Sequence, residues 1–159
     1  MISPLLNKVL RTFPPKHIVS AHCDGPCGVY DPASARIAGE AVLSMTKKIL
    51  TLETPHVDAD SQTHISYYNT LSRYIAIKEQ EAQKAKDEIL ILWTDYFKPE
   101  HLKQFPDLHE TFWHATKLCS SCKTHVSLEE AEKLLDAVKS IHEMFWKTKG
   151  RDVAWVVAS

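Results

Sequence analysis

Glycine is scarce in this chain, with 4 residues among 159, or about 2.5% where average usage is about 7%. β-Sandwiches and barrels need many tight turns, and glycine adopts the backbone conformations that such turns require. The scarcity therefore argues against a turn-rich β fold and favours long helices. Gly25, Gly28 and Gly39 lie close together in sequence, so unusual backbone conformations are expected there.

The chain also lacks an excess of charge of either sign and a long apolar run. It has 19 basic and 20 acidic residues, without the basic excess typical of proteins that bind nucleic acid or anionic membranes. The longest apolar runs, residues 89–93 and 153–158, are far shorter than the ~20 residues that span a bilayer. We therefore expect a soluble, cytoplasmic protein that binds neither nucleic acid nor a membrane.

Hydrophobic periodicity and helix-end signals predict four helices. They span residues 33–52, 61–93, 107–118 and 127–150, with a short helical piece from Pro99 before the third. Asp31-Pro32 is typical of a helix start, and Ser127 with Glu130 forms a capping box. Four amphipathic helices with short connections predict an all-α fold, an antiparallel four-helix bundle.

Residues 1–21 differ from the rest of the chain. They contain three basic residues and no acidic one, and the proline pair at 14–15 stops any helix that begins earlier. Polar residues interrupt the apolar stretch that a secretory signal requires. We predict a leader at 1–21, one domain at 22–150 and a tail at 151–159 that either caps a neighbouring subunit or is disordered.

Residues 22–32, His-Cys-Asp-Gly-Pro-Cys-Gly-Val-Tyr-Asp-Pro, concentrate metal-binding chemistry before the first helix. Gly25-Pro26 favours a tight turn, which would let the thiolates of Cys23 and Cys27 face one point. Two thiolates with nearby nitrogen donors form a soft ligand set, and their tight spacing favours a planar nickel or copper site over tetrahedral zinc. On spacing alone, a local disulfide or two unrelated core cysteines are the more frequent outcome of such a pair.

The whole string resembles the nickel superoxide dismutase family, whose mature chains begin with His-Cys-Asp-x-Pro-Cys-Gly-x-Tyr-Asp-Pro. Four further segments match in order: residues 77–80, 92–99, 105–109 and 145–149. The resemblance covers about residues 22–149, and a match of this length has a low false-positive risk. It implies a four-helix bundle with an N-terminal metal-binding hook, one nickel ion per subunit and a homohexamer.

The resemblance also implies that a maturation protease cuts between Ala21 and His22. The His22 α-amine and imidazole, the Cys23 amide nitrogen and the thiolates of Cys23 and Cys27 would then hold nickel. The metal would cycle between divalent and trivalent states while superoxide is converted to oxygen and hydrogen peroxide, and the uncleaved chain would be inactive. A nickel or copper storage module without turnover is the alternative function.

Further site residues follow from the same resemblance. Tyr30 and Tyr96 match phenols at the mouth of the family's metal site, although Tyr96 also fits an ordinary half-buried bundle tyrosine. Asp24 would fix the hook through hydrogen bonds to the backbone. Lys98 would attract the anionic substrate or simply be a solvated lysine.

One departure from the family concerns the support of the N-terminal imidazole. The family uses a glutamate paired with an arginine, and this chain has Ala38 and Glu81 at those positions. We hypothesise that Glu81 accepts a hydrogen bond from the His22 ring, which would orient the ligand by another route. The alternative is that Glu81 lies on a solvated face.

Two other features invite a metal interpretation. Cys119 and Cys122, expected after the third helix, have only His125 nearby and so lack a full zinc ligand set. We expect free thiols or a loop disulfide there. His142, on the apolar face of the last helix, is predicted to be a core histidine with a hydrogen-bond partner.

Overall fold

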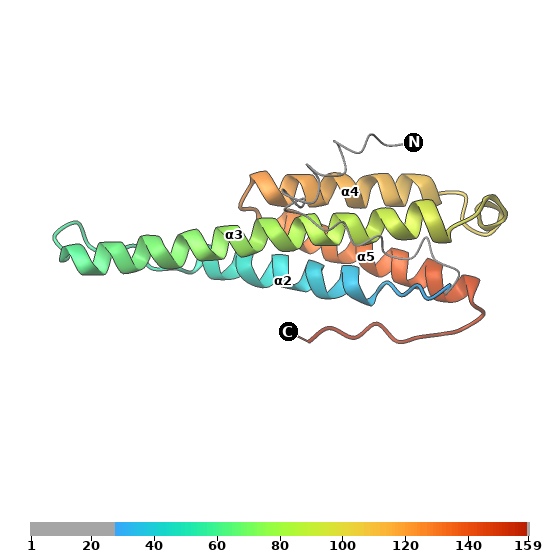
Figure 1. Cartoon of the computed structure of the whole chain (residues 1–159), viewed down its shortest axis with the longest axis horizontal. Coiled ribbons are helices and arrows are strands. Elements are labelled where there is room, and N and C mark those ends of the chain that lie inside the picture. The colour runs from blue at the N-terminus through green and yellow to red at the C-terminus, as the bar shows by residue number, and fades with distance from the viewer. Residues whose placement is uncertain (1–27, 159) are drawn as a thin grey trace, which may run out of the picture.

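A computed structural model describes residues 28–158 of the chain, and within that range it contains helices and loops but no strand. The four α-helices are α2 (Ala33–Leu50), α3 (Ser61–Ile91), α4 (Leu108–Thr124) and α5 (Leu128–Thr148). Each helix runs back along the previous one, and α5 closes the ring by packing on α2 (Figure 1). The predicted antiparallel four-helix bundle is therefore confirmed. The predicted hook precedes residue 28 and lies outside the described residues.

The helix starts follow the sequence signals closely. The Asp31 carboxylate accepts a hydrogen bond of 2.8 Å from the amide of Ala33 at the start of α2. Ser127 caps α5 by accepting a hydrogen bond of 3.3 Å from the amide of Glu130. The Glu130 carboxylate does not complete the expected capping box, because it accepts a hydrogen bond from the Ser121 hydroxyl at 2.5 Å. The local signal thus sets the helix start, and tertiary packing redirects one side chain.

The third helix is longer than the sequence predicts. It ends at Thr124 and not near residue 118, so Cys119 and Cys122 lie inside α4, and their predicted place after the helix was wrong. The reason is a cap supplied by α3. The buried ammonium of Lys78 donates to the carbonyl of Cys122, and to those of Lys123 at 3.2 Å and His125 at 2.9 Å. These bonds satisfy carbonyls that a helix end leaves without partners.

The core runs along the axis between the four helices. Its fully buried side chains come from every helix and are almost all apolar: Ala35, Val42, Ala82, Ile89, Phe112, Ala115, Leu134, Val138, Ile141 and Phe145. Burial of this apolar surface supplies the main driving force for folding. No helix among the described residues is long and apolar enough to cross a membrane.

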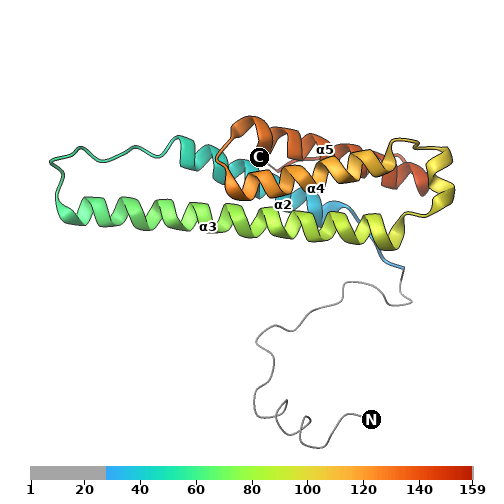
Figure 2. The ribbon, with the colours of Figure 1, turned by 90° about the horizontal axis from the view of Figure 1, so that it is seen from above.

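One part of the bundle projects beyond the rest. α3 has 31 residues whereas α4 has 17, and its first turns extend past the ends of α4 and α5 (Figures 1 and 2). The end of α2 and the loop after it accompany these turns. We call residues 47–77 the arm; it ends where Lys78 meets the end of α4.

The tail folds back along its own bundle. The amide of Ala158 donates a hydrogen bond of 2.7 Å to the Glu40 carboxylate on α2. The Trp155 ring packs on His142 of α5, with ring centroids 5.3 Å apart. Residues 151–158 are therefore not disordered, and capping of a neighbouring subunit stays a prediction.

Candidate functional site

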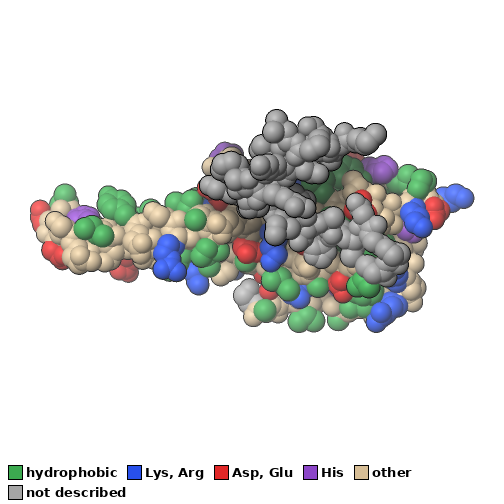
Figure 3. All heavy atoms as spheres, in the orientation of Figure 1, with side chains coloured by type: hydrophobic (Ala, Val, Ile, Leu, Met, Phe, Trp, Pro, Cys, Tyr) green, Lys and Arg blue, Asp and Glu red, His purple; other side chains and the backbone are tan. Residues whose placement is uncertain are grey.

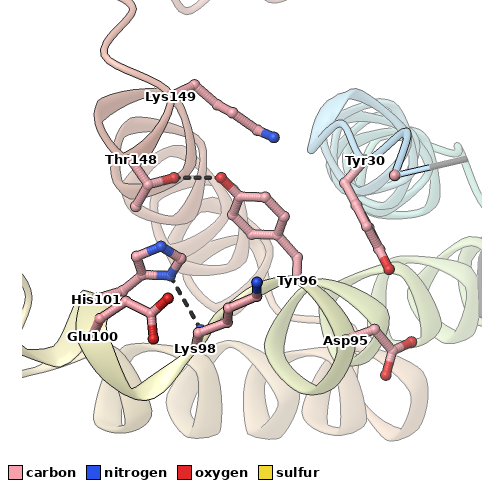
Figure 4. Close-up of a pocket in the computed structure, with 9 residues that line it drawn as sticks. Tyr30, Asp95, Tyr96, Lys98, Glu100, His101, Thr148 and Lys149 are labelled. Atoms are coloured by element: carbon pink, nitrogen blue, oxygen red, sulfur yellow. Dashed lines mark hydrogen bonds between the residues drawn. The ribbon is translucent and has the colours of Figure 1, made fainter. Parts of the chain in front are cut away.

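A pocket of about 430 Å³ lies at the end of the bundle opposite the arm. Three separate parts of the chain meet there: the segment before α2, the turns that follow α3 and the end of α5 (Figure 4). Its lining residues are Gly28, Tyr30, Asp95, Tyr96, Lys98, Glu100, His101, Thr148 and Lys149.

Gly28 is the first described residue, and it lines this pocket. Its φ of 62° lies in the left-handed region, which glycine adopts without the strain that a side chain would bring. An added Cβ would meet nothing within 4 Å, so the backbone conformation and not space requires glycine. Gly28 directly follows Cys27 in sequence, so the described part of the chain begins at the pocket, next to the last residue of the expected metal-binding segment.

An irregular corner positions Tyr96. The final turn after α3 is a π-helix, η1 (Leu92–Tyr96), and it is followed by a 3₁₀ helix, η2 (Pro99–Lys103). A π turn carries an additional residue and thereby changes the direction of the side chains that follow it. Phe97 enters the core while half-buried Tyr96 faces the pocket.

The Tyr96 hydroxyl is held by the end of α5. It lies 2.5 Å from the Thr148 hydroxyl oxygen, and the Thr148 hydroxyl donates to the carbonyl of Phe145 at 2.6 Å. A threonine hydroxyl has one hydrogen, and here Phe145 receives it. Tyr96 must therefore be the donor to Thr148, which leaves the lone pairs of the phenol oxygen as acceptors.

Rings and cations surround Tyr96. The Tyr30 ring centroid lies 5.5 Å from that of Tyr96, with the planes tilted by 54°. The His101 ring stacks on Tyr96 at 5.9 Å, and the Lys149 ammonium lies 4.8 Å from the ring centroid. A cation over an aromatic face is held by the ring quadrupole, so Lys149 brings positive charge to the pocket wall, to which Lys98 also contributes.

The structure brings some predicted site residues together. Tyr30, Tyr96 and Lys98 line one pocket. Glu81 does not line it; its carboxylate lies 3.9 Å from the Lys84 ammonium on α3. The four residues expected to hold or shape the metal site all precede residue 28 and lie outside the described residues: His22, Cys23, Asp24 and Cys27.

Within residues 28–158, no group of three histidine, cysteine, aspartate or glutamate side chains is placed to hold a metal ion. The two cysteines of α4 are free thiols, and the predicted alternative of a loop disulfide is not found. Burial raises the pKa of Cys119 to about 12 and that of Cys122 to about 11. Both thiols therefore stay protonated and unreactive at neutral pH.

His142 is the core histidine that the sequence predicts. It is buried, and its Nε2 lies 2.9 Å from the carbonyl oxygen of Val153. That carbonyl accepts the ring N–H. The bond joins α5 to the tail, so His142 has a structural role and lies away from the pocket.

Sequence reasoning did not select Thr148, Lys149 and His101 as site residues. The matching segment 145–149 contains two of them, but a match alone does not indicate which other element they face. Thr148 is 52 positions from Tyr96, and only helix packing brings them together. Sequence did offer one signal for His101: it follows α3 closely after Lys98, and both line the pocket. Basic residues close together indicate a place where an anionic ligand is favoured.

Comparison with known proteins places the chain among metalloenzymes. A family model described as nickel-containing superoxide dismutase matches residues 17–149. The chain is 40% identical over 139 residues to "Superoxide dismutase [Ni]" of Streptomyces coelicolor and equally to that of Streptomyces seoulensis, in each case over 87% of this chain and 96% of the relative.

Solved structures agree with the sequence relatives. A native nickel superoxide dismutase structure is 37% identical to this chain, with a TM-score of 0.70. The match covers 82% of this chain and 100% of the chain in that structure. A structure with nickel ligation of the oxidised state is 38% identical with a TM-score of 0.68, at the same coverage.

Proposed function

Because the chain belongs to the nickel-containing superoxide dismutase family, we propose that the pocket beside Gly28 leads to its nickel centre. The protein is a superoxide dismutase, an oxidoreductase that uses nickel as its cofactor. One observation carries the placement of the centre: the residue bonded to Cys27 lines the same pocket as Tyr30 and Tyr96.

The proposed nickel ligands come from the segment just before Gly28. They are the α-amine and imidazole of His22, the amide nitrogen and thiolate of Cys23, and the thiolate of Cys27. Thiolates and nitrogen donors form a soft set, whose chemistry fits nickel. When bound, the metal supplies one-electron redox chemistry between its divalent and trivalent states, through which superoxide becomes oxygen and hydrogen peroxide.

The described residues bind and orient what enters the pocket. Lys98 and Lys149 attract the superoxide anion, because positive charge in a cleft raises the local concentration of an anionic substrate. Tyr30 and Tyr96 narrow the pocket with two rings in contact. The Tyr96 hydroxyl donates to Thr148, so the lone pairs of its oxygen accept hydrogen bonds from water and orient the protons that the reaction consumes.

We propose that residues 1–21 are a propeptide removed by a maturation protease. An intact chain has a peptide nitrogen at His22, whereas the cut creates an α-amine with a usual pKa near 7.7–8.0. A neutral amine is a far better metal ligand than a neutral amide nitrogen. The cut between Ala21 and His22 would therefore complete the ligand set and switch the enzyme on.

Three purified chains test this proposal: the full chain, a chain that begins at His22 and a matched control that begins at Ala21. Each is given nickel, its metal content is measured by mass spectrometry, and superoxide decay is followed after pulse radiolysis. We expect turnover only from the chain that begins at His22. Equal activity of the chain that begins at Ala21 would contradict the mechanism, and nickel binding without turnover in all three would favour the storage module.

We further propose that Asp24 fixes the hook by hydrogen bonds to the backbone and that Glu81 orients the His22 imidazole. The Glu81 carboxylate is partly buried on α3 beside Lys84. Asp24→Asn should weaken nickel retention, which dialysis against a chelator measures. A Glu81→Gln variant with the nickel(III) electron paramagnetic resonance spectrum and turnover of the parent would refute the role of Glu81.

Assembly and location complete the proposal. We propose a homohexamer, on the basis of the family resemblance, and a cytoplasmic location, because polar residues in 1–21 interrupt the apolar stretch that a secretory signal requires. Light scattering of the mature protein should give six times the mass of one chain, and a smaller mass would contradict the hexamer. Activity recovered from the membrane or secreted fraction of the producing cell would contradict the cytoplasmic location.

A further inference from the structure

The arm, residues 47–77, exposes apolar side chains that its own bundle does not cover. Tyr68 and Ile65 of α3 are each 60% exposed, and Val57 in the loop is 82% exposed. α4 and α5 end before this part of α3 (Figure 2). Only the end of α2 and the following loop pack against it, so one long side of the helix remains open to solvent.

The open side of the helix is uncharged over about four turns. Its residues recur at three- and four-residue spacing and are all exposed: Ser61, Ile65, Tyr68, Asn69, Ser72 and Ala76. At 1.5 Å per residue this face is about 22 Å long. A solvated helix face normally carries charge, whereas the centre of a protein interface is depleted of charge and enriched in tyrosine.

The charges of the arm lie at its two ends. Glu53, Asp58 and Asp60 occupy the tip, and between Lys48 and Arg73 the sequence contains no lysine or arginine. Figure 3 shows acidic side chains at the free end of the arm and basic ones nearer the bundle. All of these charged side chains are exposed. The arm is therefore negative at the tip and positive at the base, on either side of an uncharged face.

We propose that the arm binds the arm of a second copy of this chain, with the two α3 helices antiparallel across a two-fold axis. This orientation places the acidic tip of each arm against the basic base of the other, so that both charged ends are matched. A parallel arrangement would set like charges together, which is unfavourable. A polar small-residue face with two apolar side chains at its centre fits close contact between helices.

The positions along α3 fit one register. If the two-fold axis passes between residues 66 and 67, Ile65 of each copy faces Tyr68 of the other, and Asp60 faces Arg73. Ser61 and Ser72 also face each other, and their small side chains let the two backbones approach closely. Next to this face is a hollow of about 260 Å³, lined by Asn69, Thr70, Arg73, Tyr74 and Ile77. The hollow gives side chains of the second copy a place to enter.

Photo-crosslinking at the centre of the face tests the contact. Tyr68 is replaced by the photoreactive p-benzoylphenylalanine in the full chain, and the purified protein is irradiated and digested for mass spectrometry. We expect a covalent dimer whose linked peptides both come from the arm. The same amino acid at Glu132, on the exposed side of α5, is the matched control and should give no link to the arm. No dimer, or a link to another surface or another protein, would overturn the proposal.

A charge exchange tests the orientation. Arg73→Glu should lower the yield of the Tyr68 crosslink about fivefold, because it sets like charges together. Adding Asp58→Lys with Asp60→Asn should restore most of it, because the facing negative charge is removed while Asn still caps the helix. Lys139→Glu makes the same charge change on α5 and serves as control. Equal yields for Arg73→Glu and Lys139→Glu, or no recovery in the triple variant, would overturn the antiparallel arrangement. Superoxide turnover should be unchanged throughout, because the arm and the pocket lie at opposite ends of the bundle.

Discussion

At the scale of single residues, the direction of one hydrogen bond determines whether Tyr96 offers the pocket a hydrogen-bond donor or an acceptor. The Thr148 hydroxyl donates to Phe145 and so can only accept from Tyr96. The phenol oxygen of Tyr96 is thereby kept as an acceptor toward the pocket. Thr148 acts through Tyr96 and is a positioning residue.

Thr148→Val should lower kcat/KM about fivefold, because a hydrogen bond of this kind contributes about 1 kcal/mol. Valine keeps the shape of threonine but removes the acceptor, so the Tyr96 hydroxyl becomes free to rotate. Thr148→Ser keeps the hydroxyl and should retain the parent rate. Pulse radiolysis at equal nickel content provides the measurement. Equal rates for the valine and serine variants would show that the orientation of Tyr96 does not matter for turnover.

At the scale of elements, a lysine on one helix determines where another helix ends. Lys78 is buried on α3, and its ammonium donates to three carbonyls at the end of α4. Burial lowers the pKa of Lys78 below its usual value of 10.5, since desolvation disfavours the charged form. The three acceptors offset this desolvation cost, which explains why a charged side chain lies inside an apolar bundle.

Lys78→Met should lower the free energy of unfolding by about 3 kcal/mol, because it leaves buried carbonyls without a donor. Methionine fills a similar volume, so the loss of stability comes from the missing hydrogen bonds more than from altered packing. Urea unfolding followed by circular dichroism measures it. Lys84→Met on the same helix changes an exposed lysine and should shift stability by no more than about 0.5 kcal/mol. A similar small shift for both variants would show that the cap contributes little.

At the scale of the whole molecule, the tail joins the two helices that close the bundle. Glu40 on α2 accepts a hydrogen bond from Ala158, and His142 on α5 contacts both Val153 and Trp155. The family match ends at residue 149, so this segment is an addition to the shared bundle. It lies away from the pocket lining, and we infer that it stabilises the fold without taking part in turnover.

Removal of residues 151–159 should lower the free energy of unfolding by about 2 kcal/mol and Tm by about 4–8 °C. Trp155→Ala in the full chain should reproduce much of this loss, because its ring packs on His142 of α5 and against the core. Val156→Ala changes an exposed neighbour and is the control. Differential scanning calorimetry measures Tm, and superoxide turnover should be retained. An unchanged Tm after truncation would mean that the tail adds no stability.

The sequence by itself determined where most of the helices form, and it carries the chemistry from which the metal site is proposed. Capping residues such as Asp31 and Ser127 and the spacing of apolar residues act over a few positions, so they can be recognised without knowing the fold. The thiols and the imidazole of residues 22–27 are likewise adjacent in sequence, and their ligand character is a property of the residue types. The extent of α4 was predicted less well, because its end depends on a residue of another helix.

Only the tertiary structure decided which distant side chains act together. Tyr96 and Thr148 are separated by 52 positions, and Lys78 and Cys122 by 44, so no local pattern links them. The open face of the arm also follows from packing, because the same apolar residues would be covered if α4 and α5 were longer. Short-range preferences fix where helices form, whereas the contacts between helices fix which surfaces remain for the pocket and for a second copy.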